Sequence, residues 1–176
     1  KMKKVACASL GALLLSPAIG FAAQPMLTVV EIVEIKAQPA AVWATLSKFD
    51  GLVKWCPPFA KSDIVSGKDG MIGAKRSLTV KDGPTFTENL LAIDPAAMTF
   101  SYDIDEPAAL PLMNYFSSMG IKPNASGGTT VAWQGSFKRR NGADNPPEGE
   151  SDAGVTGFIT GLYKACLGNL KTISEK

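Results

Sequence analysis

Two charged residues, Arg76 and Glu88, stand where a β-hairpin should be apolar. Residues 74–90 read AKRSLTVKDGPTFTENL, and two alternating polar and apolar runs flank the turn residues DGP. On the apolar side of the second run, Glu88 lies between Phe86 and Leu90. A register that keeps both apolar faces together places Arg76 directly opposite Glu88, or one diagonal step away. The sequence therefore predicts an Arg–Glu pair on the inner face of a hairpin.

Three chemical roles are open to this pair. A lone buried charge is very costly, so the favoured interpretation is an ion pair that lines a partly wet pocket. The second is a polar anchor for the carboxylate or carbonyl group of a ligand. The third is Glu88 as a general acid or base, which is least favoured because an adjacent guanidinium should lower the pKa of the Glu88 carboxyl.

The other candidate cavity residues are aromatic or apolar. Alternation along the predicted strands places Phe86, Tyr102 and Trp133 on inner faces, and helical spacing places Phe158, Leu162 and Tyr163 over a cavity. For each of them, ordinary core packing is the competing interpretation. The tyrosines are the better candidates for ligand contact, because a buried phenol needs a hydrogen-bond partner.

The chain contains no histidine. This absence excludes a Ser-His-Asp triad, a Cys-His dyad, a histidine-ligated haem and most zinc or copper sites. Cys56 and Cys166 are too few for a thiolate metal cluster, so we expect no metal and no cofactor. Since no nucleophile has an adjacent base, we expect a binding protein rather than an enzyme.

Residues 1–22 have the layout of a secretory signal peptide: the basic KMKK, an apolar run, and small residues before a cleavage point after Ala22. We therefore expect residues 23–176 to form a single periplasmic domain without a stable membrane anchor. Loss of Lys1, Lys3 and Lys4 leaves 15 basic residues against 16 acidic ones. A nearly neutral domain gives no electrostatic basis for binding nucleic acid.

The elements that must position these residues are one strand, two helices, six strands and one long helix. TVVEIVEI (28–35) predicts the first strand, Pro39 begins a helix, and a short second helix runs to Trp55. Six strand-like runs follow, separated by Gly-, Pro- or Asp-containing turns, and residues 154–173 form a helix with a broad apolar face. This order predicts an α+β fold, in which a curved seven-stranded antiparallel sheet wraps around the C-terminal helix and encloses a cavity.

Several segments carry a resemblance to a known superfamily. They are QPAAVWATLSKFDGLVKW (38–55), the G-x-x-R of Gly73–Arg76, the E-x-L-x-x-x-D of Glu88 to Asp94, NYFS (114–117) and the final helix. In this order the chain resembles the SRPBCC, or START-like helix-grip, superfamily. The resemblance implies a helix-grip fold with a ligand-sized cavity, and it places Tyr115 at a position that often lines that cavity. It implies no particular chemistry, because members bind, transport, sense or catalyse.

Among exported helix-grip proteins, the chain most resembles the MxaD type, a periplasmic accessory protein of methanol oxidation. The resemblance implies methanol dehydrogenase and its cytochrome c as partners, whose interaction the protein would promote. The alternative is a carrier or sensor of a small hydrophobic ligand. A polyketide cyclase- or dehydratase-like enzyme is a third interpretation, which the missing histidine disfavours.

The resemblance also bears on Cys56 and Cys166. In helix-grip proteins the two short helices support the C-terminal part of the long helix, so the two cysteines could approach each other. Export makes a disulfide permissible. Two free, buried thiols are nevertheless the favoured alternative, and a Cα–Cα separation above about 7 Å would exclude the bond.

Overall fold

The computed structural model describes residues 24–176, so the expected signal peptide lies outside the described residues. The strands are β1 (Leu27–Ile35), β2 (Phe59–Ser66), β3 (Lys75–Val80), β4 (Thr85–Asp94), β5 (Thr99–Ile104), β6 (Leu112–Pro123) and β7 (Thr129–Arg139). The helices are α1 (Pro39–Leu46), the short 3-10 helices η1 (Phe49–Lys54) and η2 (Glu148–Glu150), and the long α2 (Asp152–Ser174). None of these helices is long and apolar enough to cross a membrane.

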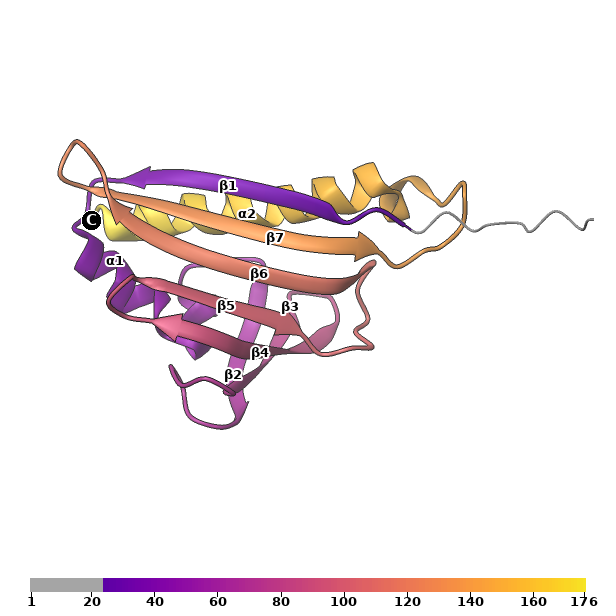
Figure 1. Cartoon of the computed structure of the whole chain (residues 1–176), viewed down its shortest axis with the longest axis horizontal. Coiled ribbons are helices and arrows are strands. Elements are labelled where there is room, and N and C mark those ends of the chain that lie inside the picture. The colour runs from indigo at the N-terminus through magenta and orange to yellow at the C-terminus, as the bar shows by residue number, and fades with distance from the viewer. Residues whose placement is uncertain (1–23) are drawn as a thin grey trace, which may run out of the picture.

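The seven strands form one antiparallel sheet in the order β1-β7-β6-β5-β4-β3-β2. The sheet bends so strongly that β2 and β3 lie behind β4 and β5, at a steep angle to β6 and β7 (Figure 1). On the same side, α2 runs along β1 and β7 (Figure 1). The predicted α+β helix-grip architecture, a curved seven-stranded sheet around the C-terminal helix, is confirmed.

The N-terminus of helix α2 is fixed by the capping residue Ser151. The Oγ of Ser151 accepts a hydrogen bond from the backbone N–H of Gly154, and Asp152 provides a negative charge in the first turn. Asp152 also forms an ion pair of 2.9 Å with Arg139 at the end of β7. The helix therefore begins two residues before the predicted start at residue 154. Its buried face consists of Val155, Ile159, Tyr163, Cys166, Leu167 and Leu170.

A disulfide joins Cys56, just after η1, to Cys166 in α2. The two Cα atoms are 4.1 Å apart, and both residues are fully buried. The preferred sequence interpretation, two free thiols, was therefore wrong. The physical reason is that the segment just after η1 lies against the C-terminal half of α2, where the Trp55 carbonyl also accepts a hydrogen bond from Asn169. That tertiary contact brings together two residues 110 positions apart.

Candidate functional site

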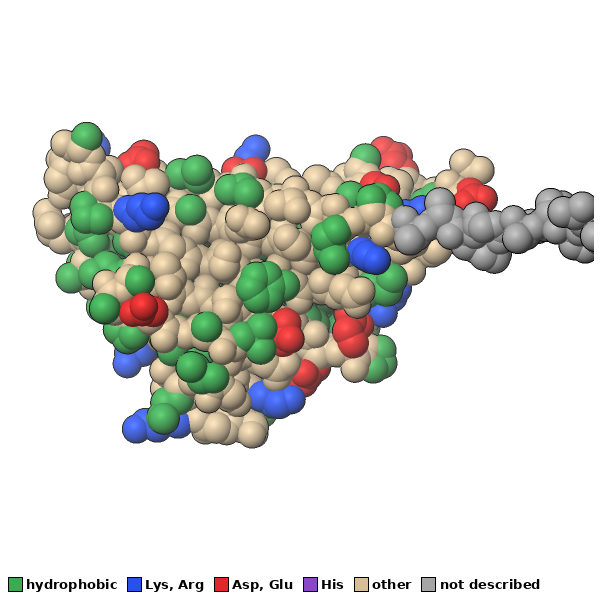
Figure 2. Space-filling model, viewed as in Figure 1, with side chains coloured by type: hydrophobic (Ala, Val, Ile, Leu, Met, Phe, Trp, Pro, Cys, Tyr) green, Lys and Arg blue, Asp and Glu red, His purple; other side chains and the backbone are tan. Residues whose placement is uncertain are grey.

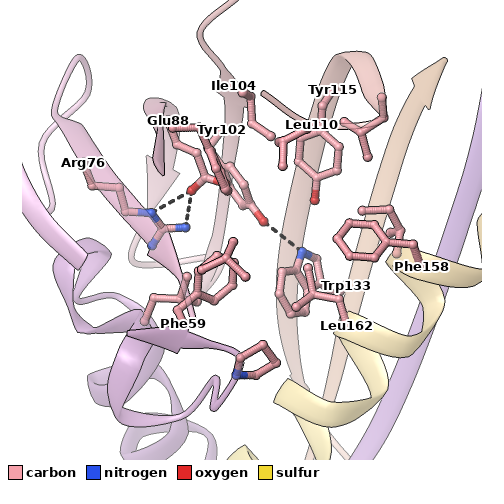
Figure 3. A pocket seen from close by; sticks show the side chains of 16 residues that line it. Phe59, Arg76, Glu88, Tyr102, Ile104, Leu110, Tyr115, Trp133, Phe158 and Leu162 are labelled. Atoms are coloured by element: carbon pink, nitrogen blue, oxygen red, sulfur yellow. Dashed lines mark hydrogen bonds and ion pairs between the residues drawn. The ribbon is translucent and has the colours of Figure 1, made fainter. Parts of the chain in front are cut away.

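An apolar cavity of about 80 Å³ lies between the inner face of the sheet and α2. Figure 3 shows Arg76, Glu88 and Tyr102 on one wall and Phe158 and Leu162 on the helix opposite. The residues that line it are Leu52, Pro58, Phe59, Arg76, Val80, Phe86, Glu88, Tyr102, Ile104, Leu110, Leu112, Tyr115, Trp133, Phe158, Ile159 and Leu162. Apart from the charged pair, the polar atoms come from aromatic side chains.

Most of the predicted site residues lie around this cavity, and one does not. Those that line it are Arg76, Glu88, Phe86, Tyr102, Tyr115, Trp133, Phe158 and Leu162. Tyr163 is fully buried and is not part of the lining, so its predicted place in the cavity was wrong. Its ring stacks on Trp133 with centroids 3.9 Å apart, which places it behind the wall rather than in it.

The sequence analysis did not predict the other half of the residues that line the cavity. The missed residues are Leu52, Pro58, Phe59, Val80, Ile104, Leu110, Leu112 and Ile159. Val80 and Ile104 share the strand parity of Arg76 and Tyr102, so alternation could have found them. Pro58 and Leu110 lie between regular elements, where neither period gives a signal.

The hairpin register places Arg76 directly opposite Glu88, and the two side chains form a buried ion pair. The Arg76 Nε donates to Glu88 Oε2 at 2.7 Å, and Nη2 lies 2.5 Å from the same oxygen (Figure 3). Arg76 also donates through Nη1 to the backbone carbonyl of Phe49. The guanidinium carbon lies 4.0 Å from the centre of the Phe49 ring, a cation–π distance. The guanidinium is thereby held by a carboxylate, a carbonyl and an aromatic face.

Burial raises the pKa of the Glu88 carboxyl, and the charge of Arg76 and its hydrogen bond oppose that rise. Arg76 acts in the expected direction, but the expected net result, a lowered pKa, was wrong, because it left out the larger effect of desolvating a carboxylate that is only 4% exposed. Glu88 is thus a buried carboxylate whose charged form depends on its partner. Removing that partner leaves no other described cation beside it.

A second polar cluster lies beside the ion pair, at the inner end of the cavity. The Trp133 Nε1–H donates to the Tyr102 hydroxyl at 3.1 Å and to Ser117 Oγ at 2.9 Å. The hydroxyl groups of Tyr115 and Tyr163 are 2.5 Å apart. The Tyr163 hydroxyl lies over Gly135, where any Cβ would clash with it, so only glycine permits this contact. The buried polar groups at this end of the cavity are therefore partnered mainly with one another.

No group of three or more His, Cys, Asp or Glu side chains in residues 24–176 is arranged to hold a metal ion.

Replacing Arg76 with alanine should leave Glu88 buried without its partner. We expect Arg76→Ala to lower the free energy of unfolding by about 3 to 5 kcal/mol, measured by urea denaturation. The double variant Arg76→Met/Glu88→Leu should lose much less, since it removes both charges. Equal unfolding midpoints for wild type and Arg76→Ala would show that the pair is not a buried ion pair.

The three tyrosines, which are all the tyrosines of the chain, should resist ionisation. Burial raises the pKa of Tyr102 to about 12 and raises those of Tyr115 and Tyr163 as well. Because the folded-state pKa of Tyr102 exceeds the unfolded value of 10, the stability linked to its neutral hydroxyl is complete below pH 10 and is lost as the pH rises through about 12. Near-ultraviolet absorbance should show no phenolate at pH 10 in the folded protein. Half-ionised phenols at that pH, with the fold intact, would contradict this.

The chain matches a known protein family and several solved structures. Residues 26–175 match the family described as "Polyketide cyclase / dehydrase and lipid transport". No curated protein matches. Among solved structures, the protein XoxI from Bacillus cereus is 25% identical, with a TM-score of 0.70 over 84% of this chain and 94% of that one.

Two further structures show the same fold at lower identity. The Zhui aromatase/cyclase from a Streptomyces species is 19% identical, with a TM-score of 0.73 over 86% of this chain and 94% of that one. A protein from Nitrosospira multiformis is 21% identical, with a TM-score of 0.67 over 84% and 96% of the two chains. Because the family match covers nearly all of the described residues, the protein belongs to the polyketide cyclase / dehydrase and lipid transport family, whose helix-grip fold it has.

Proposed function

We propose that this protein is a non-enzymatic, periplasmic binding protein that holds a small hydrophobic molecule in its cavity. One observation carries this proposal: apolar and aromatic side chains line the cavity, and among residues 24–176 its two charged lining residues, Arg76 and Glu88, are paired with each other. Apolar surface that faces a cavity is stabilised when an apolar ligand displaces water from it. Such a site can bind by shape and hydrophobicity without any reactive group.

The same residues argue against catalysis. Phenols are neutral at neutral pH, and burial raises the pKa values of Tyr102 and Tyr115 further, so no phenolate base is present at that pH. Glu88 is the one residue that favours the alternative, a cyclase- or dehydratase-like enzyme, because burial raises the pKa of its carboxyl. However, its Oε2 atom accepts from two nitrogens of Arg76, which holds the group in an ion pair rather than aimed at a substrate.

The Cys56–Cys166 disulfide supports the proposed compartment. Structural disulfides form and persist outside the reducing cytosol. This agrees with the export signal that we expect at residues 1–22, and together the two features favour the periplasm.

A bulkier side chain in the cavity wall should block the binding of a ligand there. We expect benzene to bind saturably to the wild-type protein and to perturb the fluorescence of Trp133, which lines the cavity. Leu162→Trp adds bulk to the helix wall and should weaken benzene binding at least about tenfold, because interior space is closely packed. Titration calorimetry provides an independent affinity.

The matched control is Leu91→Trp, a change of the same size at a residue that is 41% exposed and outside the lining. It should bind benzene like the wild type. Equal weakening by both substitutions, or no saturable binding to any of the three proteins, would count against a cavity ligand.

A protein-partner role rests on a different surface. The outward faces of β1 and β6 expose Val30, Ile32 and Phe116, which are 50%, 61% and 46% exposed. Figure 2 views this outer face of the sheet, where hydrophobic side chains lie among backbone and uncharged polar groups and the charges of both signs are scattered. A surface without one dominant charge fits a weak, transient partner. Together with the MxaD-type resemblance, it favours an accessory role in the encounter of methanol dehydrogenase with its cytochrome c.

The accessory role predicts an effect on electron transfer. Adding the mature protein to methanol dehydrogenase and its cytochrome c should raise the rate of cytochrome reduction. Ile32→Glu places a charge on the exposed outer face of the edge strand β1 and should abolish the increase, whereas Val65→Glu, at an exposed valine on β2, should leave it intact. An unchanged rate with the wild-type protein would exclude this role and leave the ligand proposal standing.

A further inference from the structure

Strand β1 lies at one end of the sheet, and within residues 24–176 it has a neighbouring strand, β7, on one side only (Figure 1). In an antiparallel pair, alternate residues direct their N–H and C=O groups towards the neighbouring strand or away from it. Two hydrogen bonds to α2 show which residues of β1 point away from β7. Lys171 Nζ donates to the carbonyl of Glu34, and the N–H of Lys36 donates to Glu175 Oε1. The even-numbered residues therefore carry the free edge.

Three residues of this edge, Thr28, Val30 and Ile32, have outward backbone groups without a hydrogen-bond partner in residues 24–176. All three residues are exposed. A row of unpaired N–H and C=O groups on an edge strand is a template for the addition of another strand. The free edge of β1 therefore has the hydrogen-bonding capacity to extend the sheet.

The other edge of the sheet is protected against such pairing, and this one is not. On β2 the register shifts twice, between Phe59 and Lys61 and between Ile64 and Ser66, and Lys61 is exposed. Irregularities and exposed lysines are the features that keep an edge strand from pairing with another chain. Strand β1 pairs regularly with β7 along its whole length and contains neither lysine nor proline. The two edges therefore differ in their readiness to accept a strand.

We propose that a second copy of this chain binds along the free edge of β1, through its own β1, antiparallel and related by a two-fold axis at Val30. In this register Val30 lies opposite Val30 of the second copy, and Thr28 lies opposite Ile32. Each of these residues exchanges a pair of hydrogen bonds across the axis, about six bonds in all. That number lies within the range of about 10 ± 5 for an ordinary protein interface. The dimer goes beyond the proposed cavity function and does not depend on it.

The charge of Glu31 favours this register over the next one along the strand. An axis at Glu31 would place two copies of its carboxylate directly opposite each other, which is destabilising. With the axis at Val30, Glu31 lies opposite Val29 of the second copy. It also keeps Lys164 of its own chain at 3.8 Å.

The hydrogen bonds of the edge exclude the other nearby registers. An axis at Ile32 would pair Val30 with Glu34, whose carbonyl already accepts from Lys171. An axis at Val29 would pair Ile32 with Met26, which precedes the first residue of β1. Only the axis at Val30 uses all the free groups of β1 and none that is already bonded.

Helix α2 leaves room for the second copy. At about 100° per residue, Gly157, Gly161 and Gly168 lie on the same side of α2 as Lys164 and Lys171, the two lysines that reach β1. Within residues 24–176, nothing outside the helix lies within 4 Å of a Cβ built on any of these glycines. The two-fold axis turns this side of both α2 helices towards each other. Glycine permits two backbones to approach closely there.

The oligomeric state of the mature protein tests the proposal. Sedimentation equilibrium should show a monomer–dimer equilibrium for the wild type. Val30→Pro removes the N–H at the axis and places a ring at the edge, so the dissociation constant should rise at least about tenfold. The monomer should keep its fold, because this N–H has no partner in it. The matched control is Val30→Thr, which keeps the N–H and a β-branched side chain and should dimerise like the wild type.

Cysteine cross-linking tests the register without a proline. Cys56 and Cys166 are bonded to each other, so the mature protein brings no competing thiol. Under mild oxidation Val30→Cys should cross-link to itself. Thr28→Cys and Ile32→Cys should each cross-link poorly alone, because identical positions then lie about 13 Å apart, but well when mixed.

Three results would overturn the proposal. The first is a wild-type protein that stays monomeric up to about 1 mM, which would leave the edge to an extended segment of another protein. The second is a dimer that Val30→Pro leaves intact or that Val30→Thr disrupts equally, since backbone pairing at β1 would not then hold it. The third is cross-linking of Thr28→Cys alone as readily as of Val30→Cys. None of these results bears on ligand binding in the cavity, which uses other residues.

Discussion

The placement of a guanidinium inside an apolar interior is the constraint on which much of the structure depends. Arg76 cannot lie there alone, so three separate elements contribute to its surroundings: Glu88 from β4, the carbonyl and ring of Phe49 from η1, and the Tyr102 ring from β5, 5.3 Å away. Any slip of the β3–β4 register by one residue would move one charge to the opposite face of the sheet. The pair therefore specifies the hairpin register and the position of η1 beneath the sheet, whatever its net contribution to stability.

Much of this arrangement follows from local sequence patterns. The alternation around DGP predicted that Arg76 and Glu88 would face inwards as cross-strand neighbours, because β-strand side chains alternate with a period of two. Of the two registers that it left open, the structure has the one in which they lie directly opposite each other. The same rule placed Tyr102 and Trp133 on the inner face, and helical periodicity predicted the extent of α2 to within two residues at its N-terminal end. In strongly periodic segments, the sequence alone therefore indicates the type of element and which side chains face inwards.

Other features depend on contacts that no local pattern contains. Periodicity predicted that Tyr163 is buried, but not that Trp133 would stand between it and the cavity. Pro58 and Leu110 reach the cavity from irregular segments. The pKa direction of Glu88 depends on how completely the folded chain excludes water, and the bond between Cys56 and Cys166 depends on where η1 packs. Each of these is decided by tertiary structure, so sequence spacing alone could not reveal it.

The disulfide has a mechanical consequence for the cavity. Phe158 and Leu162, which cover it, lie eight and four residues before Cys166 on the same helix, about 12 Å and 6 Å along its axis. A helix bonded covalently so near its covering residues cannot swing away as a lid does. Under the proposed function, a ligand would have to enter between side chains, and Phe158, 45% exposed, is the covering residue that solvent reaches most. Exchange would then follow side-chain and loop motion, on a timescale of about nanoseconds to microseconds, rather than the movement of a domain.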